Sequence, residues 1–142
     1  MRISIKGQGR ILMIGLDTSA LVDLFRGDEK IKELFSQLDE ELASTHINYF
    51  ELMVGIDLKD YSYHEELEFF KSLFEEVKLL TLSKDSCKSS SLIHWELKKS
   101  GKMIGKLDCM IAGIFLANGV NKIITRNAKH FENIKGLKAI SY

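Results

Sequence analysis

The sequence contains no proline, only two cysteines and a single tryptophan among its 142 residues, and its positive and negative charges cancel. The cysteines, Cys87 and Cys109, form no CxxC pair and accompany no His-rich motif, which excludes a disulfide framework and a zinc site. Such cysteine usage is typical of a reducing compartment, so we expect a cytoplasmic protein. No Pro-rich, Gly/Ser-rich or repeated segment marks a linker, which favours a single structural unit.

Long hydrophobic runs are also missing. The main apolar runs cover 11–16 and 109–117, and both are far shorter than the roughly 20 residues that span a bilayer. The first run is also too short for a secretory signal, so we expect neither a membrane span nor export. With 45% hydrophobic and 28% charged residues, the chain has the composition of a globular domain, which excludes disorder, collagen and coiled coil.

The zero net charge hides an uneven distribution. Residues 28–76 contain fourteen acidic and four basic side chains, and the rest of the chain contains six acidic and sixteen basic ones. Part of the surface can therefore attract phosphate although the molecule is neutral. For a charge run taken alone, a pair of solvated helix faces is the better explanation.

Apolar runs alternate with segments of helical periodicity, which predicts βαβ units and a mostly parallel sheet of four to five strands in a three-layer α/β/α sandwich. Thr18 or Ser19 is expected to cap the first helix. The helix over 83–100 has a weak buried stripe of Cys87, Ser90, Ile93 and Leu97. The predicted strands cover 11–16, 41–47, 77–82, 122–125 and 138–142, and the predicted helices cover 20–26, 29–38, 48–58, 63–76, 83–100 and 107–117.

Three acidic residues and one amide are expected at the carboxyl ends of the strands, where open α/β sheets bind ligands. Asp17 ends the first strand, Asn127 follows the fourth, and Glu51 and Asp108 lie in the first turns of helices. Each acid has a simpler explanation on its own: a helix cap for Asp17, a favourable first-turn charge for Asp108 and a surface position for Glu51.

Together these acids favour a metal site. Asp108 opens an apolar helix and Glu51 lies in the apolar context YFELMVGI, where carboxylates are costly unless a cation compensates them. Lys102 and Lys106 could serve as that cation, but a divalent ion suits three converging carboxylates better. All-oxygen ligands indicate Mg²⁺ or Mn²⁺ rather than zinc.

Four segments carry a family resemblance. In order along the chain they are LDTSALVDLFRG at 16–27, FEL at 50–52, GKMIGKLDCMIAG at 101–113 and TRNAKHFENIKGL at 125–137. They resemble the four motifs of the PIN domain, and the nearest branch is that of the VapC-type toxin ribonucleases of prokaryotic toxin–antitoxin pairs. The resemblance covers about residues 13–142.

The resemblance implies a metal-dependent endoribonuclease with Asp17, Glu51 and Asp108 as metal ligands. The family's fourth position, Asp or Asn, falls on Asn127, whose carbonyl oxygen brings no charge and weakens the case for a second metal. Ser19 and Thr125 would be hydroxyls that orient the ligands or a metal-bound water. The resemblance also implies a homodimer and a small antitoxin that blocks the active site.

This chemistry agrees with the residue types. A carboxylate-bound metal activates water and stabilises the leaving oxygen, so phosphodiester hydrolysis needs no nucleophilic side chain. The sequence offers none, because Cys109 lies inside an apolar helix and is expected in the core. His130 either faces the site or packs beside Phe131. The side chains expected to contact RNA phosphates are Arg126, Lys129, Lys102 and Lys106.

Other functions stay open at this stage. A phospho-receiver domain also places acids at strand ends, but it needs adjacent acids after the first strand and a lysine after the last, which this sequence lacks. A non-catalytic PIN-fold module that binds RNA or protein is the stronger alternative, followed by a stand-alone RNA-processing nuclease. Residues 1–12 precede the motifs, and we expect them to be a partly disordered extension or Met13 to be the true start.

Overall fold

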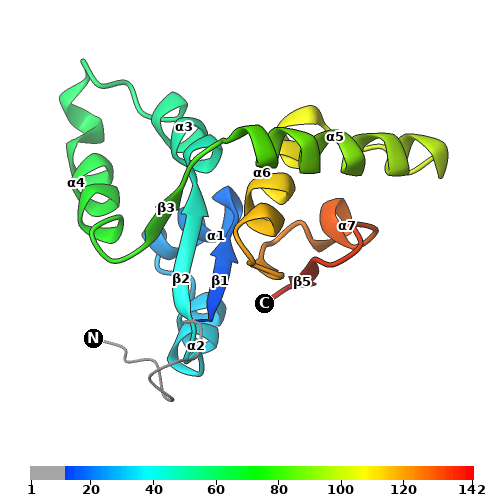
Figure 1. Cartoon of the computed structure of the whole chain (residues 1–142). Coiled ribbons are helices and arrows are strands. Elements are labelled where there is room, and N and C mark those ends of the chain that lie inside the picture. Colours follow the sequence, from blue (N-terminus) through cyan, green and yellow to red (C-terminus); the bar gives the residue numbers. More distant parts are fainter. Residues whose placement is uncertain (1–11) are drawn as a thin grey trace.

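The computed structural model describes residues 12–142 (Figure 1). Within this range, five strands form one parallel sheet in the order β3-β2-β1-β4-β5. The expectations for the N-terminal extension therefore lie outside the described residues, apart from Leu12, whose carbonyl accepts a hydrogen bond from the Glu41 amide at 2.9 Å. The strands are β1 (Met13–Leu16), β2 (Glu41–Thr45), β3 (Lys78–Leu80), β4 (Lys122–Ile124) and β5 (Lys138–Ile140).

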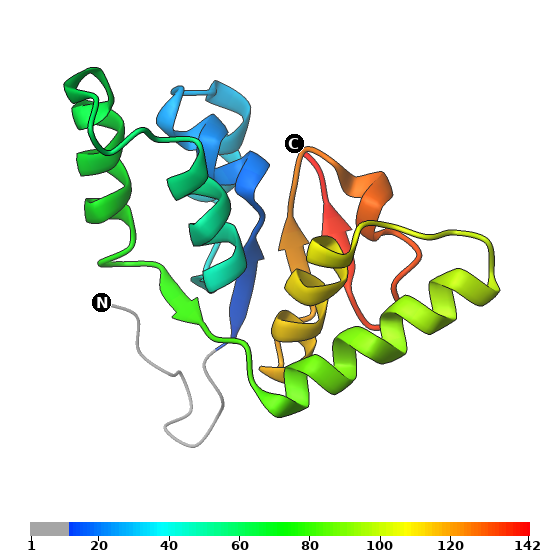
Figure 2. The same ribbon diagram turned by 90° about the horizontal axis from the view of Figure 1, so that it is seen from above.

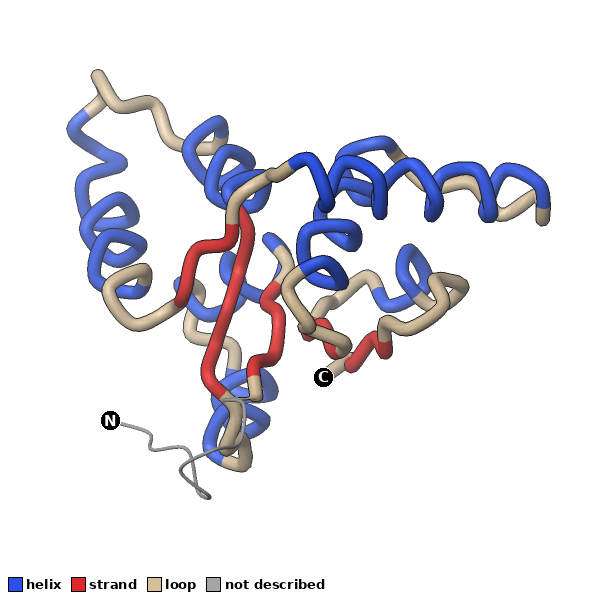
Figure 3. The backbone as a smooth tube through the Cα atoms, viewed as in Figure 1, coloured by secondary structure: helices blue, strands red, loops and turns tan. Residues whose placement is uncertain are grey.

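Helices connect each strand to the next, which confirms the predicted α/β/α class (Figure 3). No helix within residues 12–142 is both long and apolar enough to cross a membrane. The helices are α1 (Thr18–Phe25), α2 (Glu29–Ser36), α3 (His46–Val54), α4 (His64–Leu73), α5 (Lys84–Lys99), α6 (Lys106–Ala117) and α7 (Ala128–Phe131), with the short 3₁₀ helix η1 (Tyr61–Tyr63) before α4.

The sheet separates two hydrophobic cores because successive strand residues point to opposite faces. Ile14 and Leu16 of β1 and Ile124 of β4 join the core beneath α1–α4. Ile123 of β4 faces the other way, into the core that α5, α6 and α7 cover. Figure 2 shows the two groups of helices with the strands between them. The sheet is thus buried on both faces, as its continuous apolar strands predict.

Two predicted helix starts are wrong by a few residues. Helix α1 begins at Thr18, and Asp17 rather than Thr18 or Ser19 occupies its N-cap position. Helix α3 begins at His46 and not near residue 48, because the Thr45 hydroxyl accepts hydrogen bonds from the amides of Ile47 and Asn48 at 3.1 and 3.2 Å. This cap ends β2 at Thr45, two residues earlier than the apolar pattern predicts.

The buried stripe of α5 differs from the predicted one at a single position. Cys87 is exposed, and the buried residues are Ser86, Ser90, Ile93 and Leu97. Ser83 caps the helix through the Ser86 amide at 3.1 Å, which turns Ser86 and not Cys87 toward α6. Small serines are required here because the backbones of α5 and α6 approach closely at Gly113.

We predict that Gly113→Ala destabilises the fold. An added Cβ would lie 2.1 Å from the Ser90 Oγ and 2.8 Å from the Ser86 carbonyl oxygen, so the two helices must separate. Overpacking of this kind costs about 1–3 kcal/mol, and thermal unfolding measures it. Gly55→Ala is the control, because the nearest atom to its added Cβ is 3.4 Å away. Equal losses in the two variants would contradict close packing at Gly113.

Candidate active site

The candidate site lies at the carboxyl ends of the three central strands. Asp17 follows β1, which β2 and β4 flank in the sheet. Its amide continues the β1–β4 ladder by donating to the Ile124 carbonyl at 3.0 Å. Asp17 as a whole residue is 6% exposed and is therefore buried at this edge of the sheet.

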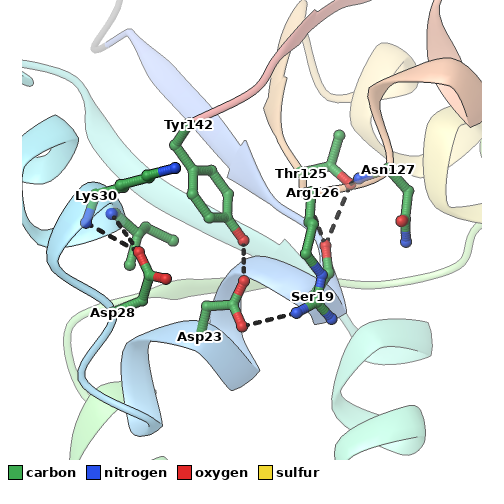
Figure 4. A network of polar contacts seen from close by, with 9 residues as sticks. Ser19, Asp23, Asp28, Lys30, Thr125, Arg126, Asn127 and Tyr142 are labelled. Carbon is green, nitrogen blue, oxygen red and sulfur yellow. Dashed lines mark hydrogen bonds and ion pairs between the residues drawn. The ribbon is translucent and has the colours of Figure 1, made fainter.

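Both oxygens of the Asp17 carboxylate accept hydrogen bonds from side chains that follow the neighbouring strands. Thr125, after β4, donates to Oδ2 at 2.8 Å, and Asn48, on α3, donates to Oδ1 at 3.2 Å. Ser19 lies beside Thr125, with 3.3 Å between the hydroxyl oxygens. Thr125 thus contacts Asp17 directly and Ser19 contacts Thr125, and Figure 4 shows Ser19 and Thr125 together.

Asn48 and Thr18 are site residues that the sequence analysis missed. The Thr18 hydroxyl donates to Glu51 Oε1 at 2.6 Å and accepts from Asn48 Nδ2 at 3.0 Å. The Thr45 hydroxyl in turn donates to Asn48 Oδ1 at 2.8 Å. Asn48 therefore links Asp17 to the Thr18–Glu51 pair. An uncharged amide one turn before Glu51 on the same helix was the available signal.

Asp108 lies in the first turn of α6 and contacts His130 of α7. Its Oδ2 is 3.2 Å from His130 Nδ1. Of the two positions expected for His130, the structure therefore shows the one that faces the acids. Phe131 is fully buried whereas the His130 side chain is 57% exposed, and the two rings therefore do not share one environment. Lys106, considered above as a partner of Asp108, is exposed at the start of the same helix.

The three carboxylates influence one another electrostatically. Burial raises the pKa of Asp17 above its usual value, and the charge of Asp108 raises it further against the opposing hydrogen bonds. Burial also raises the pKa of Glu51, to which the charges of Asp17 and Asp108 add. Mutual repulsion therefore disfavours the fully ionised site, and a bound cation would relieve it.

The carboxylates do not form a ready-made metal cluster. Within residues 12–142, no three Asp, Glu, His or Cys side chains lie at the spacing of a metal site. The donor set still fits a hard divalent ion: every candidate ligand contributes oxygen, and the group carries excess negative charge. Asn127 lies near the same rim, and its amide donates to Thr125 Oγ1 at 2.9 Å.

The predicted RNA-contacting cations all lie at exposed positions. Lys106 precedes Asp108 by two residues and Lys129 lies on α7. Lys102 lies in the loop between α5 and α6, and its amide donates to the Leu97 carbonyl at 2.9 Å. Arg126 differs from the lysines because its Nη1 pairs with the buried Asp23 at 3.0 Å.

Comparisons with known proteins agree with this arrangement. The PIN domain family model matches residues 14–137. Ribonuclease VapC1 of Haemophilus influenzae is 32% identical over 127 residues, which cover 87% of this chain and 92% of the relative. The tRNA(fMet)-specific endonuclease VapC of Salmonella typhimurium is 25% identical over 129 residues, which cover 90% of this chain and 96% of that protein.

Solved structures match as well. VapBC-1 from nontypeable Haemophilus influenzae superposes with a TM-score of 0.77 at 29% identity, over 92% of this chain and 98% of that one. VapBC2 from Rickettsia felis, bound to a promoter DNA fragment, gives a TM-score of 0.79 at 20% identity, over 92% of this chain and 99% of that one, which supports the fold alone.

The sheet order, the acids at its carboxyl edge and the family match define a PIN domain, and the chain belongs to that family. Its similarity to Ribonuclease VapC1 over most of both chains places it among the VapC ribonucleases. The predicted fold class and family are both confirmed.

We predict that Thr125→Val destabilises the protein although it preserves the shape of the side chain. Thr125 is fully buried. Valine has no hydroxyl, so Asp17 Oδ2 would lose a donor and the Asn127 amide would lose its acceptor. An unsatisfied buried polar group costs about 1–3 kcal/mol, measurable by denaturant unfolding. Thr125→Ser keeps the hydroxyl and is the control; a valine variant as stable as the serine variant would contradict this role.

Proposed function

We propose that this VapC ribonuclease is a divalent-metal-dependent endoribonuclease that hydrolyses RNA phosphodiester bonds as the toxin of a type II toxin–antitoxin pair. The observation that carries the proposal is the electrostatic coupling of Asp17, Glu51 and Asp108 at one edge of the sheet. Asp108 raises the pKa of Asp17, and both of these acids raise the pKa of Glu51, so the three charges are costly to maintain unless a cation binds there.

Asp17, Glu51 and Asp108 would hold Mg²⁺ or Mn²⁺, with Asn127 as a neutral fourth candidate. When bound, the ion lowers the pKa of water and stabilises the charge of the leaving oxygen. The chain's own residues orient the ligands: Thr125 and Asn48 fix Asp17 from two sides. Thr18 holds one oxygen of Glu51.

The exposed cations would bind the RNA backbone. Lys102, Lys106 and Lys129 are solvent-accessible, and lysines of this kind contact phosphates without reading sequence. His130 keeps one oxygen of Asp108 in place at the same rim. The free cysteines Cys87 and Cys109 support action in the reducing cytoplasm, where RNA substrates are present.

An antitoxin partner is part of the proposal, since similar solved structures are VapBC toxin–antitoxin complexes. Phe50 and Val54, four residues apart on α3, expose 59% and 69% of their surfaces, and Leu58 beyond the helix exposes 65%. These three residues, here called the α3 surface, lie within the segment that carries fourteen acidic and four basic residues. An amphipathic helix with basic flanks fits such a surface.

The homodimer would use another surface. Leu92 and Trp95 on α5 are 66% and 51% exposed, and α5 covers the opposite face of the sheet from α3. A second copy of the chain could cover α5 while the antitoxin covers α3.

Two alternative functions remain as possible outcomes of the experiments. RNA binding without cleavage in either metal supports a non-catalytic module, and cleavage without any antitoxin gene nearby supports a stand-alone nuclease.

The metal site is tested by Asp108→Asn, which removes one charge at nearly constant shape. We expect cleavage to be lost while the metal-free protein stays as stable as wild type or becomes more stable, because repulsion of Asp17 and Glu51 falls. The rise in melting temperature on adding Mg²⁺ or Mn²⁺ should shrink. Calorimetry and an RNA cleavage assay measure both effects.

Asp85→Asn is the matched control, since Asp85 also lies in the first turn of a helix, α5, and is exposed. It should keep cleavage and the metal response. A destabilised, metal-indifferent Asp108→Asn protein that still cleaves RNA would contradict the proposed metal site.

The antitoxin surface is tested by Val54→Lys. A lysine on α3 should repel a basic partner and expose fewer apolar atoms to it, so co-purification with the product of a neighbouring short reading frame should be lost while RNA cleavage is retained. Leu92→Lys, at 66% exposure against 69% for Val54, is the matched control and should keep the complex. Loss of the complex only in Leu92→Lys would place the antitoxin on α5 instead.

A further inference from the structure

Asp23 of α1 is a buried acid outside the group of predicted metal ligands. Its side chain is 7% exposed, so the carboxylate depends on partners for its charge and hydrogen bonds. Two partners supply them from distant parts of the chain: Arg126 Nη1 lies 3.0 Å from Oδ1, and the Tyr142 hydroxyl donates to Oδ2 at 2.5 Å. Figure 4 shows both side chains converging on Asp23.

Arg126 is held at two points by the same helix. Its amide donates to the Ser19 hydroxyl at 3.0 Å, and its guanidinium pairs with Asp23, four residues later on α1. Arg126 also lies directly between Thr125, which donates to Asp17, and Asn127. The position of the guanidinium is therefore tied to the position of the Asp17 carboxylate.

The guanidinium is fixed but not covered. The Arg126 side chain is 53% exposed, and a guanidinium has five N–H donors, of which the bond to Asp23 uses one on Nη1. The other donors would each need a hydrogen-bond partner if they were buried. Here they face solvent beside the site, where the planar fork of arginine suits a phosphate group.

Tyr142 completes the arrangement without adding charge. Burial raises the pKa of its phenol, as do its hydrogen bond to Asp23 and that carboxylate's charge, so the hydroxyl stays protonated and donates. Its ring packs against the core beneath α1–α4. The phenol thereby holds the second oxygen of Asp23 and leaves the first for Arg126.

We propose that Asp23 and Tyr142 are positioning residues that hold the Arg126 guanidinium at the edge of the active site, where it binds a phosphate of the RNA next to the bond that is cleaved. This rests on the ribonuclease function proposed above. A cation held in place loses less freedom on binding than a free lysine does. Arg126 is thus assigned a fixed phosphate contact, whereas Lys102, Lys106 and Lys129 contribute less oriented attraction.

The test compares Tyr142→Phe, Arg126→Ala and the double variant with wild type on a short RNA, by steady-state cleavage and by RNA binding across salt concentrations. Tyr142→Phe keeps the ring and removes only the hydrogen bond. We expect it to raise KM about 3–10-fold with kcat within about twofold, and Arg126→Ala to do at least as much and to lower the salt slope by about one. Tyr63→Phe is the control for loss of a phenol and should change neither quantity.

The double variant distinguishes a role of Tyr142 in positioning Arg126 from a role in the stability of the fold alone. If Tyr142 acts through Arg126, the double variant matches Arg126→Ala alone. If the effects multiply, or if Tyr142→Phe lowers the melting temperature while KM and RNA affinity stay at wild-type values, the positioning role is overturned. Wild-type protein that binds RNA but cleaves none in Mg²⁺ or Mn²⁺ overturns the nuclease proposal instead. In that case the RNA-binding measurements on the variants still decide the role of Tyr142.

Discussion

The buried carboxylate of Asp17 connects the three central strands of the sheet at their carboxyl ends. It follows the central strand β1, and it accepts hydrogen bonds from Thr125 after β4 and from Asn48 on the helix after β2. Burial disfavours its charge, so the segments that follow the neighbouring strands have to supply donors at fixed positions. The same donors continue outward, since Asn48 also bonds Thr18, which holds Glu51.

The second constraint comes from the other face of the sheet. Asp108 reaches the rim from α6, whose place depends on the close approach of α5 at Gly113 and on the stacking of Phe115 against Gly15 of β1. An added Cβ at Gly15 would lie 2.7 Å from the Phe115 ring, so α6 lies almost directly on the central strand. The acidic rim therefore depends on packing in both cores.

The sequence predicts the strand and helix alternation and the core position of Cys109, because these follow from apolar periodicity. The placing of Ser19 and Thr125 near the acids is implied by the family resemblance and not by periodicity. The prediction from sequence fails where one polar cap or contact outweighs periodicity. The Thr45 cap moves the start of α3, and the Ser83 cap turns Ser86 rather than Cys87 inward. The sequence analysis also does not find Asn48, Asp23 and Tyr142, because each has its role only through a partner 31 to 119 residues away.

The strand order β3-β2-β1-β4-β5 also has a consequence for the order of synthesis. The first half of the chain, through β3, contains Asp17 and Glu51 together with Asn48 and Thr18, but it lacks Asp108 and Thr125. One flank of the central strand stays unpaired until β4 has emerged from the ribosome. A chain that ends before α6 therefore has only two of the three candidate metal ligands, and one that ends before β4 also lacks the Thr125 hydroxyl that holds Asp17.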